Sequence, residues 1–397
     1  MTKRPEIVLV THTIPLDSGF LAAKFIQLSE KMDVHLYTWD TKENLDKFIN
    51  KHKLPDSIKN KIYLAYSQTA WLQMTLHLLA AIVTNSRIRK FALHGEGSVI
   101  QRIKYIITYL PLLRLNPEII HFEFGTLAHK AVKFKQLTDA KLSASFRGYD
   151  LNYAGLDDET YYNEVWKSFD GFHFLGNDLK LRAIKRGYIG DKTEVLIPPA
   201  IDVTYFTREN NKPTNTKFII VSVGRLVWKK GYEYAIKAMA LLKEKEVDFE
   251  YRITGSGDYL QAIQYTVTEL GLNNNVKILG ELAADKIKEE LNRADVFLHP
   301  AVSEGFSNAV LEAQAMSLPI VCTDADGLAE NIEDKVTGFV VPKWDAEAIA
   351  EKLMWCYSHQ EDAARMGEKG VERVNKLFRI EQQIGTFVKY YRDLKKA

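Results

Sequence analysis

The sequence predicts an α/β protein whose two domains each form a doubly wound parallel sheet. The chain has 397 residues, and a usual domain size of roughly 100–200 residues favours two domains. Short apolar runs alternate with segments of helical pattern along both halves. Strands that are apolar along their whole length are typical of parallel sheets covered by helices on both faces.

The first half contains seven runs with the length and composition of buried strands. They are residues 6–10, 33–39, 61–67, 118–122, 141–146, 171–175 and 193–197. Helices are expected near 19–31, 70–84 and 97–110. This succession is enough for one complete parallel sheet.

The second half repeats the pattern with six further strand candidates, at 217–223, 249–254, 276–279, 295–299, 319–323 and 338–342. Between 231 and 245 the apolar residues keep the i, i+3/i+4 spacing of a helix. Segment 197–217 is rich in proline, asparagine and threonine and marks the expected link between domains. We therefore expect domains over 1–197 and 198–375, followed by a terminal helix at 376–397.

The longer stretch 371–397, which includes this segment, has the pattern of a helix with an apolar inner face. The face is made by Val374, Leu377, Phe378, Ile380, Ile384 and Phe387. An ordinary last helix of the second domain would show the same pattern.

The composition limits which partners and which cellular compartment are expected. The formal net charge is only +2, which gives no general electrostatic support for a nucleic-acid partner. Two cysteines, Cys322 and Cys356, provide neither a disulfide framework nor a metal cluster and fit a reducing compartment. The apolar run near the start is about five residues long, shorter than a signal-peptide core. A cytoplasmic protein is expected.

One stretch is unusually apolar. Residues 71–83 are too few for a transmembrane helix, which needs about 20 apolar residues. Basic residues follow at 87–114. The region 71–114 fits either a buried or surface-docked helix, or peripheral contact with an anionic membrane surface.

Open parallel sheets bind ligands at the carboxyl ends of their strands, so functional residues are expected in the loops there. In segment 221–236, Arg225 and Lys230 follow a strand and could neutralise a diphosphate. Basic loop residues are also commonly just solvated. In segment 252–260, two glycines permit close backbone approach to a ligand or a plain tight turn, and the spacing lacks the full dinucleotide-binding pattern.

The segment 303–319, SEGFSNAVLEAQAMSLP, combines a loop glutamate with a helix start. Ser307 is a good N-cap for a helix over 308–317, Gly305 permits the preceding turn, and Glu304 lies in the loop. The amides of Ser307, Asn308 and Ala309 are expected to point outward at the helix start and to offer an anion site, and Glu312 follows just over one turn into the helix. This arrangement suits a nucleotide-sugar, with its sugar by Glu304, its diphosphate at the helix start and its ribose hydroxyl groups by Glu312. Stabilisation of the helix dipole by early acidic residues explains Glu312 in part and Glu304 poorly.

Several motifs stand in a recognisable order. EGFSNAVLEA (304–313) is an E-x7-E pattern, preceded by GRLVWKKG (224–231), VLIPPAID (195–202) and DVFLHPA (295–301). EIIHFEFGTLA (118–128) and SFRGYDLN (145–152) add weaker matches. Together they resemble retaining glycosyltransferases of the GT-B fold, in particular glycosyltransferase family 4 (group 1).

The resemblance implies two Rossmann-like domains facing a central cleft, with the acceptor on the first and the donor on the second. It implies that the terminal helix crosses back to the first domain. It also implies a donor-binding set made of Gly19, Arg225, Lys230, Gly305, Phe306, Ser307, Asn308 and Glu312. Arg225 and Lys230 would hold the diphosphate and Glu312 the ribose.

Two residues are implied to be catalytic, Glu304 and Arg147. Glu304 would contact the transferred sugar and help its departure. Arg147 stands where many family members have histidine, and its fixed charge would favour an acidic acceptor. The family transfers sugar with retention and needs neither a metal ion nor a cofactor, because the nucleotide-sugar is itself a substrate.

The expected activity is therefore transfer of a sugar from a UDP- or GDP-sugar to a glycan or lipid-linked acceptor. A bacterial surface polysaccharide or glycolipid would be the product, made in the cytoplasm or at the cytoplasmic face of the inner membrane. The alternatives are a non-catalytic scaffold of the same fold and a nucleotide-sugar epimerase. Binding of UDP or GDP separates the scaffold from the enzymes.

Overall fold

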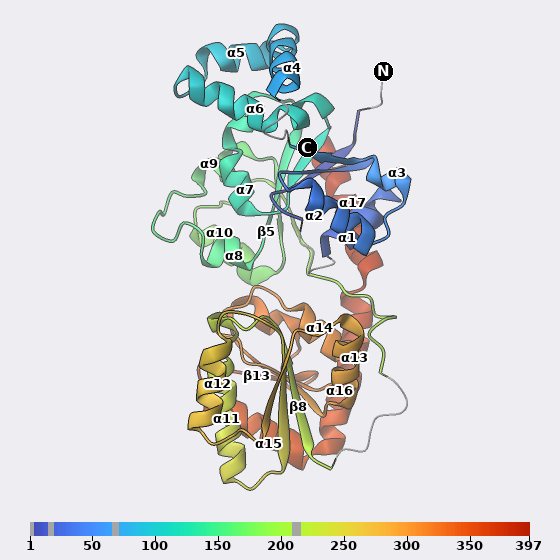
Figure 1. Ribbon diagram of the computed structural model, residues 1–397, viewed down its shortest axis with the longest axis vertical. Helices are drawn as coiled ribbons and strands as arrows, with labels where there is room; N and C mark the ends of the chain where they lie inside the picture. The colour runs from blue at the N-terminus through green and yellow to red at the C-terminus, as the bar shows by residue number, and fades with distance from the viewer. Residues whose placement is uncertain (1–3, 15–19, 66–70, 209–215) are drawn as a thin grey trace. The chain divides into compact units, whose positions relative to one another are not determined.

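The computed structural model describes residues 4–14, 20–65, 71–208 and 216–397. The chain divides into two compact units (Figure 1). The first unit comprises Met1–Leu175, Leu179–Ile197 and Ile384–Ala397. The second comprises Gly176–Asp178 and Pro198–Gln383.

The first unit is built on a seven-stranded sheet in the order β3-β2-β1-β4-β5-β6-β7. All neighbouring strands are parallel. The chain starts in the middle, moves to one edge and then returns to build the other half, which is the doubly wound arrangement. The strands are β1 (Ile7–Thr11), β2 (Val34–Thr38), β3 (Ile62–Leu64), β4 (Ile119–Phe122), β5 (Lys141–Phe146), β6 (Gly171–Phe174) and β7 (Thr193–Leu196).

Helices connect these strands, because parallel neighbours need a crossover connection. They are α1 (Phe20–Ser29), α2 (Lys42–Lys51), α3 (Asp56–Lys59), α4 (Trp71–Thr84), α5 (Ser86–His94), α6 (Val99–Leu115), α7 (Gly125–Lys130), the 3-10 helix η1 (Val132–Gln136), α8 (Gly148–Asn152), α9 (Asn163–Ser168) and α10 (Asn177–Lys185). A capping box formed by Ser98 and Gln101 starts α6.

The second unit has a six-stranded parallel sheet in the order β10-β9-β8-β11-β12-β13. Its strands are β8 (Phe218–Val223), β9 (Phe249–Thr254), β10 (Val276–Gly280), β11 (Val296–His299), β12 (Ile320–Thr323) and β13 (Gly338–Val341). Its helices are η2 (Trp228–Lys230), α11 (Tyr232–Glu244), α12 (Leu260–Glu269), α13 (Ala284–Arg293), α14 (Asn308–Ala315), η3 (Asp326–Asn331), α15 (Ala346–Ser358) and α16 (Gln360–Leu377).

Both faces of this sheet are buried. Ile220 and Leu298 belong to the apolar cluster under α11, α12 and α15. Their chain neighbours Val221 and Phe297 belong to a separate cluster under α13 and α14. Successive side chains of a strand point to opposite faces, so continuous apolar runs are needed to fill both clusters. The thirteen predicted strands are all present.

The end of the chain differs from the single helix predicted over 371–397. Two helices are present, since α16 ends at Leu377 and α17 (Ile380–Lys396) begins after Phe378 and Arg379. The carbonyl of Phe378 accepts the amide of Ile201 at 3.0 Å, and Ile201 forms a short parallel bridge with Arg379. This tertiary pairing competes with helical continuation. Leu377 was predicted on the inner face but is exposed.

The apolar stretch at 71–83 lies in α4, and of the predicted alternatives the surface-docked helix is found and the buried helix is excluded. No residue of α4, which the structure describes in full, is buried. The helix docks on α5 and α6 at the end of the first unit (Figure 1). Among the helices of the described ranges, none combines the length and the apolar character needed to cross a bilayer.

Candidate active site

The second unit places its charged loop residues at the carboxyl end of β11, where the chain turns into α14. Ser307 caps α14 as predicted, with its hydroxyl accepting the amide of Val310. The helix ends at Ala315, two residues before the predicted end, and Ser317 takes a left-handed conformation with φ of +57°. Glu304 therefore lies in the loop between strand and helix.

Glu304 is the centre of a compact charged group. Its carboxylate forms an ion pair with Lys230 and lies 3.5 Å from Nε2 of His299. All three side chains are largely buried. Burial alone would raise the pKa of Glu304, but Lys230 and His299 outweigh it and hold the pKa well below its usual range. Glu304 is therefore an anion at neutral pH.

His299 complements this anion as a neutral group. Burial and the nearby charge of Lys230 lower the pKa of His299 to about 4. A neutral imidazole can donate a hydrogen bond to Glu304 without adding a second full charge to the site. His299 was part of the DVFLHPA motif but was not among the predicted site residues. Its position as the last residue of an apolar strand was a usable signal, because side chains at that edge line ligand sites.

Lys230 reaches Glu304 because the loop 224–231 is fixed to the loop after β11 by its backbone. The amide of Val302 donates to the carbonyl of Lys229 at 2.8 Å. Gly231 has φ of +64°, and a Cβ there would lie 2.2 Å from the carbonyl oxygen of Pro300. The last glycine of GRLVWKKG is thus required by close approach between two loops.

The two glycines of segment 252–260 have a similar role. A Cβ on Gly255 would lie 1.9 Å from the carbonyl oxygen of Gly224, and one on Gly257 would lie 2.2 Å from that of Leu226. The amide of Leu226 also donates to the carbonyl of Ser256 at 2.8 Å. Close packing of two loops accounts for these glycines. Arg225, at the centre of the packed loop, is exposed.

The loop from Gly305 to Asn308 is held by a residue that the sequence did not reveal. Asn331, fully buried, accepts the amide of Ser307 at 3.1 Å and donates to the carbonyl of Ser307 at 2.7 Å. The prediction that the Ser307 amide points outward toward an anion is therefore wrong. The amides of Asn308 and Ala309 lie in the first turn, where helix geometry supplies no partner.

The other predicted residues of this segment fall into two roles. Phe306 packs against Phe378, with ring centroids 5.8 Å apart, and anchors the loop on the apolar cluster beneath α14. Gly305 is buried in the loop itself. Glu312 is partly buried one turn into α14, and burial raises the pKa of Glu312 to about 7. Near neutral pH such a carboxyl group is protonated in part of the molecules, so it can both donate hydrogen bonds to hydroxyl groups and accept hydrogen bonds from them.

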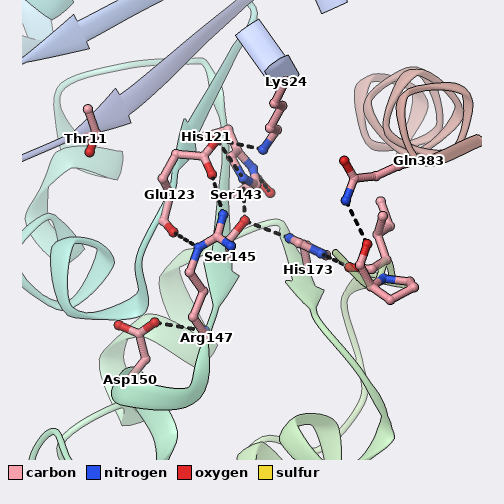
Figure 2. A network of polar contacts seen from close by, with 12 residues as sticks. Thr11, Lys24, His121, Glu123, Ser143, Ser145, Arg147, Asp150, His173 and Gln383 are labelled. Atoms are coloured by element: carbon pink, nitrogen blue, oxygen red, sulfur yellow. Dashed lines mark hydrogen bonds and ion pairs between the residues drawn. The ribbon is translucent and has the colours of Figure 1, made fainter. Parts of the chain in front are cut away.

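In the first unit, Arg147 does not carry an isolated charge. Figure 2 shows its guanidinium directed at Glu123, with Nη2 3.0 Å from the carboxylate and Nε 3.2 Å from the carbonyl of the same residue. The guanidinium also lies 4.1 Å from the centroid of the Phe20 ring. Lys24 approaches the other carboxylate oxygen of Glu123 at 2.6 Å. Two cations therefore share one fully buried carboxylate.

Burial lowers the pKa of Lys24 to about 8, although Glu123 opposes this shift. Glu123 itself has a lowered pKa, because Lys24 and Arg147 outweigh the effect of burial. Neither Lys24 nor Glu123 was predicted as a site residue. Glu123 directly follows the strand in EIIHFEFGTLA, which was a usable signal, whereas Lys24 lies within the apolar helix α1 and gave none.

Asp150 fixes the loop that carries Arg147. Its carboxylate accepts the amides of Arg147 at 2.9 Å and of Thr126 at 3.0 Å. The SFRGYDLN motif thus closes a turn at the carboxyl end of β5. Gly19, the remaining predicted donor-binding residue, lies outside the described residues.

A chain of neutral polar groups supports this corner from inside the unit. His121 bonds Ser143 at 2.9 Å and Ser145 at 2.8 Å, and Ser145 in turn bonds His173 at 2.8 Å (Figure 2). Burial and the charges of Lys24 and Arg147 lower the pKa of both histidines well below the usual value. The strands β4, β5 and β6 are therefore joined by uncharged side chains beneath Glu123.

Part of this chain is similar in sequence to a known protein family. Residues 204–373 match the family described as "Glycosyl transferases group 1". The matched residues lie within the second unit. This match covers the loops that carry Arg225, Lys230, Glu304 and Glu312.

Two bacterial glycosyltransferases are among the relatives with similar sequences. The amylovoran biosynthesis glycosyltransferase AmsK of Erwinia amylovora is 30% identical over 59% of this chain and 60% of its own length. The capsular polysaccharide biosynthesis glycosyltransferase CapM of Staphylococcus aureus is 25% identical over 97% of both chains. The chain thus spans about three-fifths of AmsK and nearly all of CapM.

The fold also has solved counterparts. The structure of HepE from Anabaena in complex with UDP and glucose superposes with a TM-score of 0.73, covers 98% of this chain and 100% of that one, and is 14% identical. The prediction of two doubly wound parallel sheets in the GT-B architecture is confirmed. The central cleft between them stays a prediction.

Proposed function

We propose that this chain is a retaining glycosyltransferase that moves a sugar from a nucleotide-diphosphate-sugar to a glycan or lipid-linked acceptor. The observation that carries the proposal is the buried Glu304–Lys230 pair at the carboxyl end of β11, within the residues that match the group 1 glycosyltransferases. CapM and AmsK, the named relatives, support bacterial surface polysaccharide biosynthesis as the setting. The UDP in the HepE structure supports a UDP- or GDP-sugar as donor.

The donor would lie along the start of α14. Lys230 and the exposed Arg225 would supply positive charge to the diphosphate, together with the first-turn amides of Asn308 and Ala309. Glu304 would accept hydroxyl groups of the sugar, and Glu312 would bond the ribose hydroxyls. Because side-chain cations neutralise the leaving group, the proposal requires no metal ion.

The reaction would proceed on one face of the sugar. The acceptor oxygen attacks the anomeric carbon from the side on which the diphosphate leaves, while the bond from that carbon to the phosphate oxygen breaks. The proton of the acceptor passes to a departing phosphate oxygen. Glu304, held as an anion by Lys230, would stabilise the positive charge that develops on the sugar.

Arg147 would act on the acceptor side. Its charge is partly offset by Glu123, and its side chain is 19% exposed. The remaining donors of a guanidinium fixed in this way can bind an acidic group with defined orientation. A phosphate-bearing or otherwise acidic acceptor suits this position. A site at the cytoplasmic face of the inner membrane would bring the chain to a lipid-linked acceptor.

A panel of nucleotide-sugars tests the proposal. One donor should release its nucleotide with the purified chain, slowly alone and faster with acceptor, and Glu304→Ala should lower the rate by about thirtyfold to a thousandfold, equivalent to roughly 2–4 kcal/mol. Glu289→Ala is the matched control, because this glutamate pairs with Lys286 on the surface of the same unit. Equal activity of the two variants would refute the role of Glu304.

Two further results would redirect the assignment. Titration calorimetry that detects neither UDP nor GDP binding would leave a scaffold of the same fold. Conversion of the donor into an epimeric sugar without transfer would indicate an epimerase. Product analysis by mass spectrometry and NMR distinguishes epimerisation, hydrolysis and transfer, and the anomeric coupling constant of the product reports retention.

A further inference from the structure

Helix α4 exposes an apolar face that no part of the described chain covers. Leu72, Leu76, Leu79 and Val83 recur at i, i+4, i+7 and i+11 and so lie along one side of the helix. Each is between 55% and 71% exposed. Trp71, at the first turn, is 64% exposed. Contiguous exposed apolar surface of this kind marks an interaction site.

The opposite side of α4 is already used for packing. Met74, Leu78, Ala81 and Ile82 are half-buried, and α4 contacts α5 and α6. The helix is thus apolar around most of its circumference, and only one of its sides has a partner within the chain. Between residues 71 and 86, His77 is the single titratable side chain. A helix with this composition is expected to be covered on both sides.

The charge around α4 indicates what covers it. Residues 71–116 contain six basic residues and one acidic residue, Glu96, a net charge of +5. Because the whole chain has a net charge of only +2, the remaining residues together have a net charge of −3. The positive charge is concentrated in α5 and α6, the two helices on which α4 packs. Arg89, Lys90 and Lys104 are exposed.

We propose that α4, with the basic residues of α5 and α6, binds the surface of a membrane that contains anionic phospholipid. A helix of 14 residues is about 21 Å long and cannot span an apolar layer of about 30 Å, so α4 would lie in the plane of the interface. Its exposed face would enter the acyl boundary, while the basic side chains meet lipid phosphates. A second copy of this chain would bring two strongly positive surfaces together, which is unfavourable.

A hollow beside these helices is consistent with binding of an anionic headgroup. It has a volume of about 390 Å³ and lies between α5, α6, α7 and η1. Arg102, Lys130, Lys133 and His129 contribute to its lining, against the single acid Glu96. Lys133 pairs with Glu96 at 3.1 Å, so the positive charge there is only partly offset. This inference stands on the first unit and does not depend on sugar transfer.

Co-sedimentation with lipid vesicles tests the proposal. We expect strong binding to vesicles of phosphatidylglycerol and phosphatidylcholine, weak binding to phosphatidylcholine alone, and a decline with added salt. Leu76→Ser/Leu79→Ser should lower binding to the anionic vesicles by roughly a hundredfold, since it removes two apolar side chains without changing charge. Lys90→Gln/Lys104→Gln should lower it at least about tenfold.

Matched controls separate the surface from general effects. Leu181→Ser/Ile189→Ser removes two side chains with comparable or greater exposure elsewhere on the same unit and should leave binding unchanged. The tryptophan emission of the wild type should shift to the blue on binding, and Trp71→Phe should remove most of that shift. These readouts remain informative even if a serine variant fails to fold.

Several outcomes would overturn the proposal. They are absence of binding to anionic vesicles, equal binding to neutral ones, equal loss in the control double variant, or an unchanged Trp71 signal. Light scattering that shows a dimer, dissociated by Leu76→Ser/Leu79→Ser in the absence of lipid, would assign the face to a second copy instead. None of these measurements uses transferase activity, so their failure and that of the proposed function are distinguishable.

Discussion

Replacement of Lys230 by methionine should destabilise the second unit far more than the loss of an ordinary surface ion pair. Lys230 is the cation that holds Glu304 ionised in a largely buried position, with side chains 13% and 15% exposed. Lys230→Met keeps most of the volume of the side chain but leaves the carboxylate without its charge partner. His299 is a poor replacement at neutral pH, because its burial, the largest cause of its lowered pKa, remains when Lys230 is removed.

The magnitude follows from the burial of the pair. Removal of one member of a buried ion pair costs about 3–5 kcal/mol, and the hydrogen bond from His299 and the remaining exposure of Glu304 favour the lower end, near 3 kcal/mol. The double variant Lys230→Met/Glu304→Gln has no buried charge left. It should lose only about 1 kcal/mol, roughly 2 kcal/mol less than Lys230→Met alone.

Hydrogen exchange followed by mass spectrometry measures this effect in one unit at a time. Peptides from β8 and β11 report opening of the second unit, and a loss of about 3 kcal/mol should accelerate their exchange roughly a hundredfold. Lys286→Met is the matched control, because Lys286 pairs with Glu289 on the surface and exposed pairs of this kind contribute little to stability. Peptides from the first unit should exchange as in the wild type.

Two results would refute this reasoning. Equal exchange in Lys230→Met and Lys286→Met would show that Glu304 does not need the charge of Lys230. A double variant as unstable as Lys230→Met would show that packing, rather than an unpaired charge, causes the loss.

Three further predictions concern other parts of the molecule. Gly255→Ala should lower the free energy of unfolding, measured by heat or urea, by about 3 kcal/mol, because its Cβ would lie 1.9 Å from the carbonyl oxygen of Gly224. Gly190→Ala is the control, since Gly190 also has positive φ but open space around it, and it should cost about 1 kcal/mol. Equal costs would contradict the packing argument. Because the pKa values of His121 and His173 are lowered, the unfolded chain binds protons there below pH of about 6.5 while the folded chain does not. The free energy of unfolding of the first unit should therefore fall on acidification, by up to about 2.7 kcal/mol per pH unit, and a flat profile down to pH of about 5 would exclude this linkage. Burial raises the pKa of Glu312 to about 7, so the folded carboxyl binds its proton more tightly than the unfolded one and stability falls as pH rises between about 4.5 and 7; Glu312→Gln should abolish that fall in thermal melts while weakening nucleotide binding in calorimetry, and unchanged binding would remove Glu312 from the donor site.

The strands and the start of α14 could be predicted because each depends on local information. Ile220 and Val221 are both apolar because they are buried on opposite faces of the sheet. The continuous apolar run to which they belong therefore predicts a buried strand. Ser307 caps the helix with its own hydroxyl. The ion pair between Lys230 and Glu304 was not predicted, although both residues were, because 74 positions separate them.

What could not be predicted depends on partners distant in the sequence. Asn331 holds Ser307 from 24 positions away, within a segment that shows no pattern of its own. Ile201 ends the helical run at Phe378 through a hydrogen bond across the unit. The exposure of α4 was undecidable from its composition, because buried helices and interfacial helices share the same apolar residues.

The return of α17 to the first unit has a consequence for the order of folding during synthesis. Ile384, Phe387, Tyr391 and Leu394 are buried in that unit, and Tyr390 bonds Ser143 of β5 at 2.7 Å. The ribosome makes these residues only after it has made all of the second unit. The second unit can therefore complete its core while the first, although synthesised earlier, still lacks one side of its own. The nascent first unit is the part of the chain that most needs protection from aggregation until α17 is released.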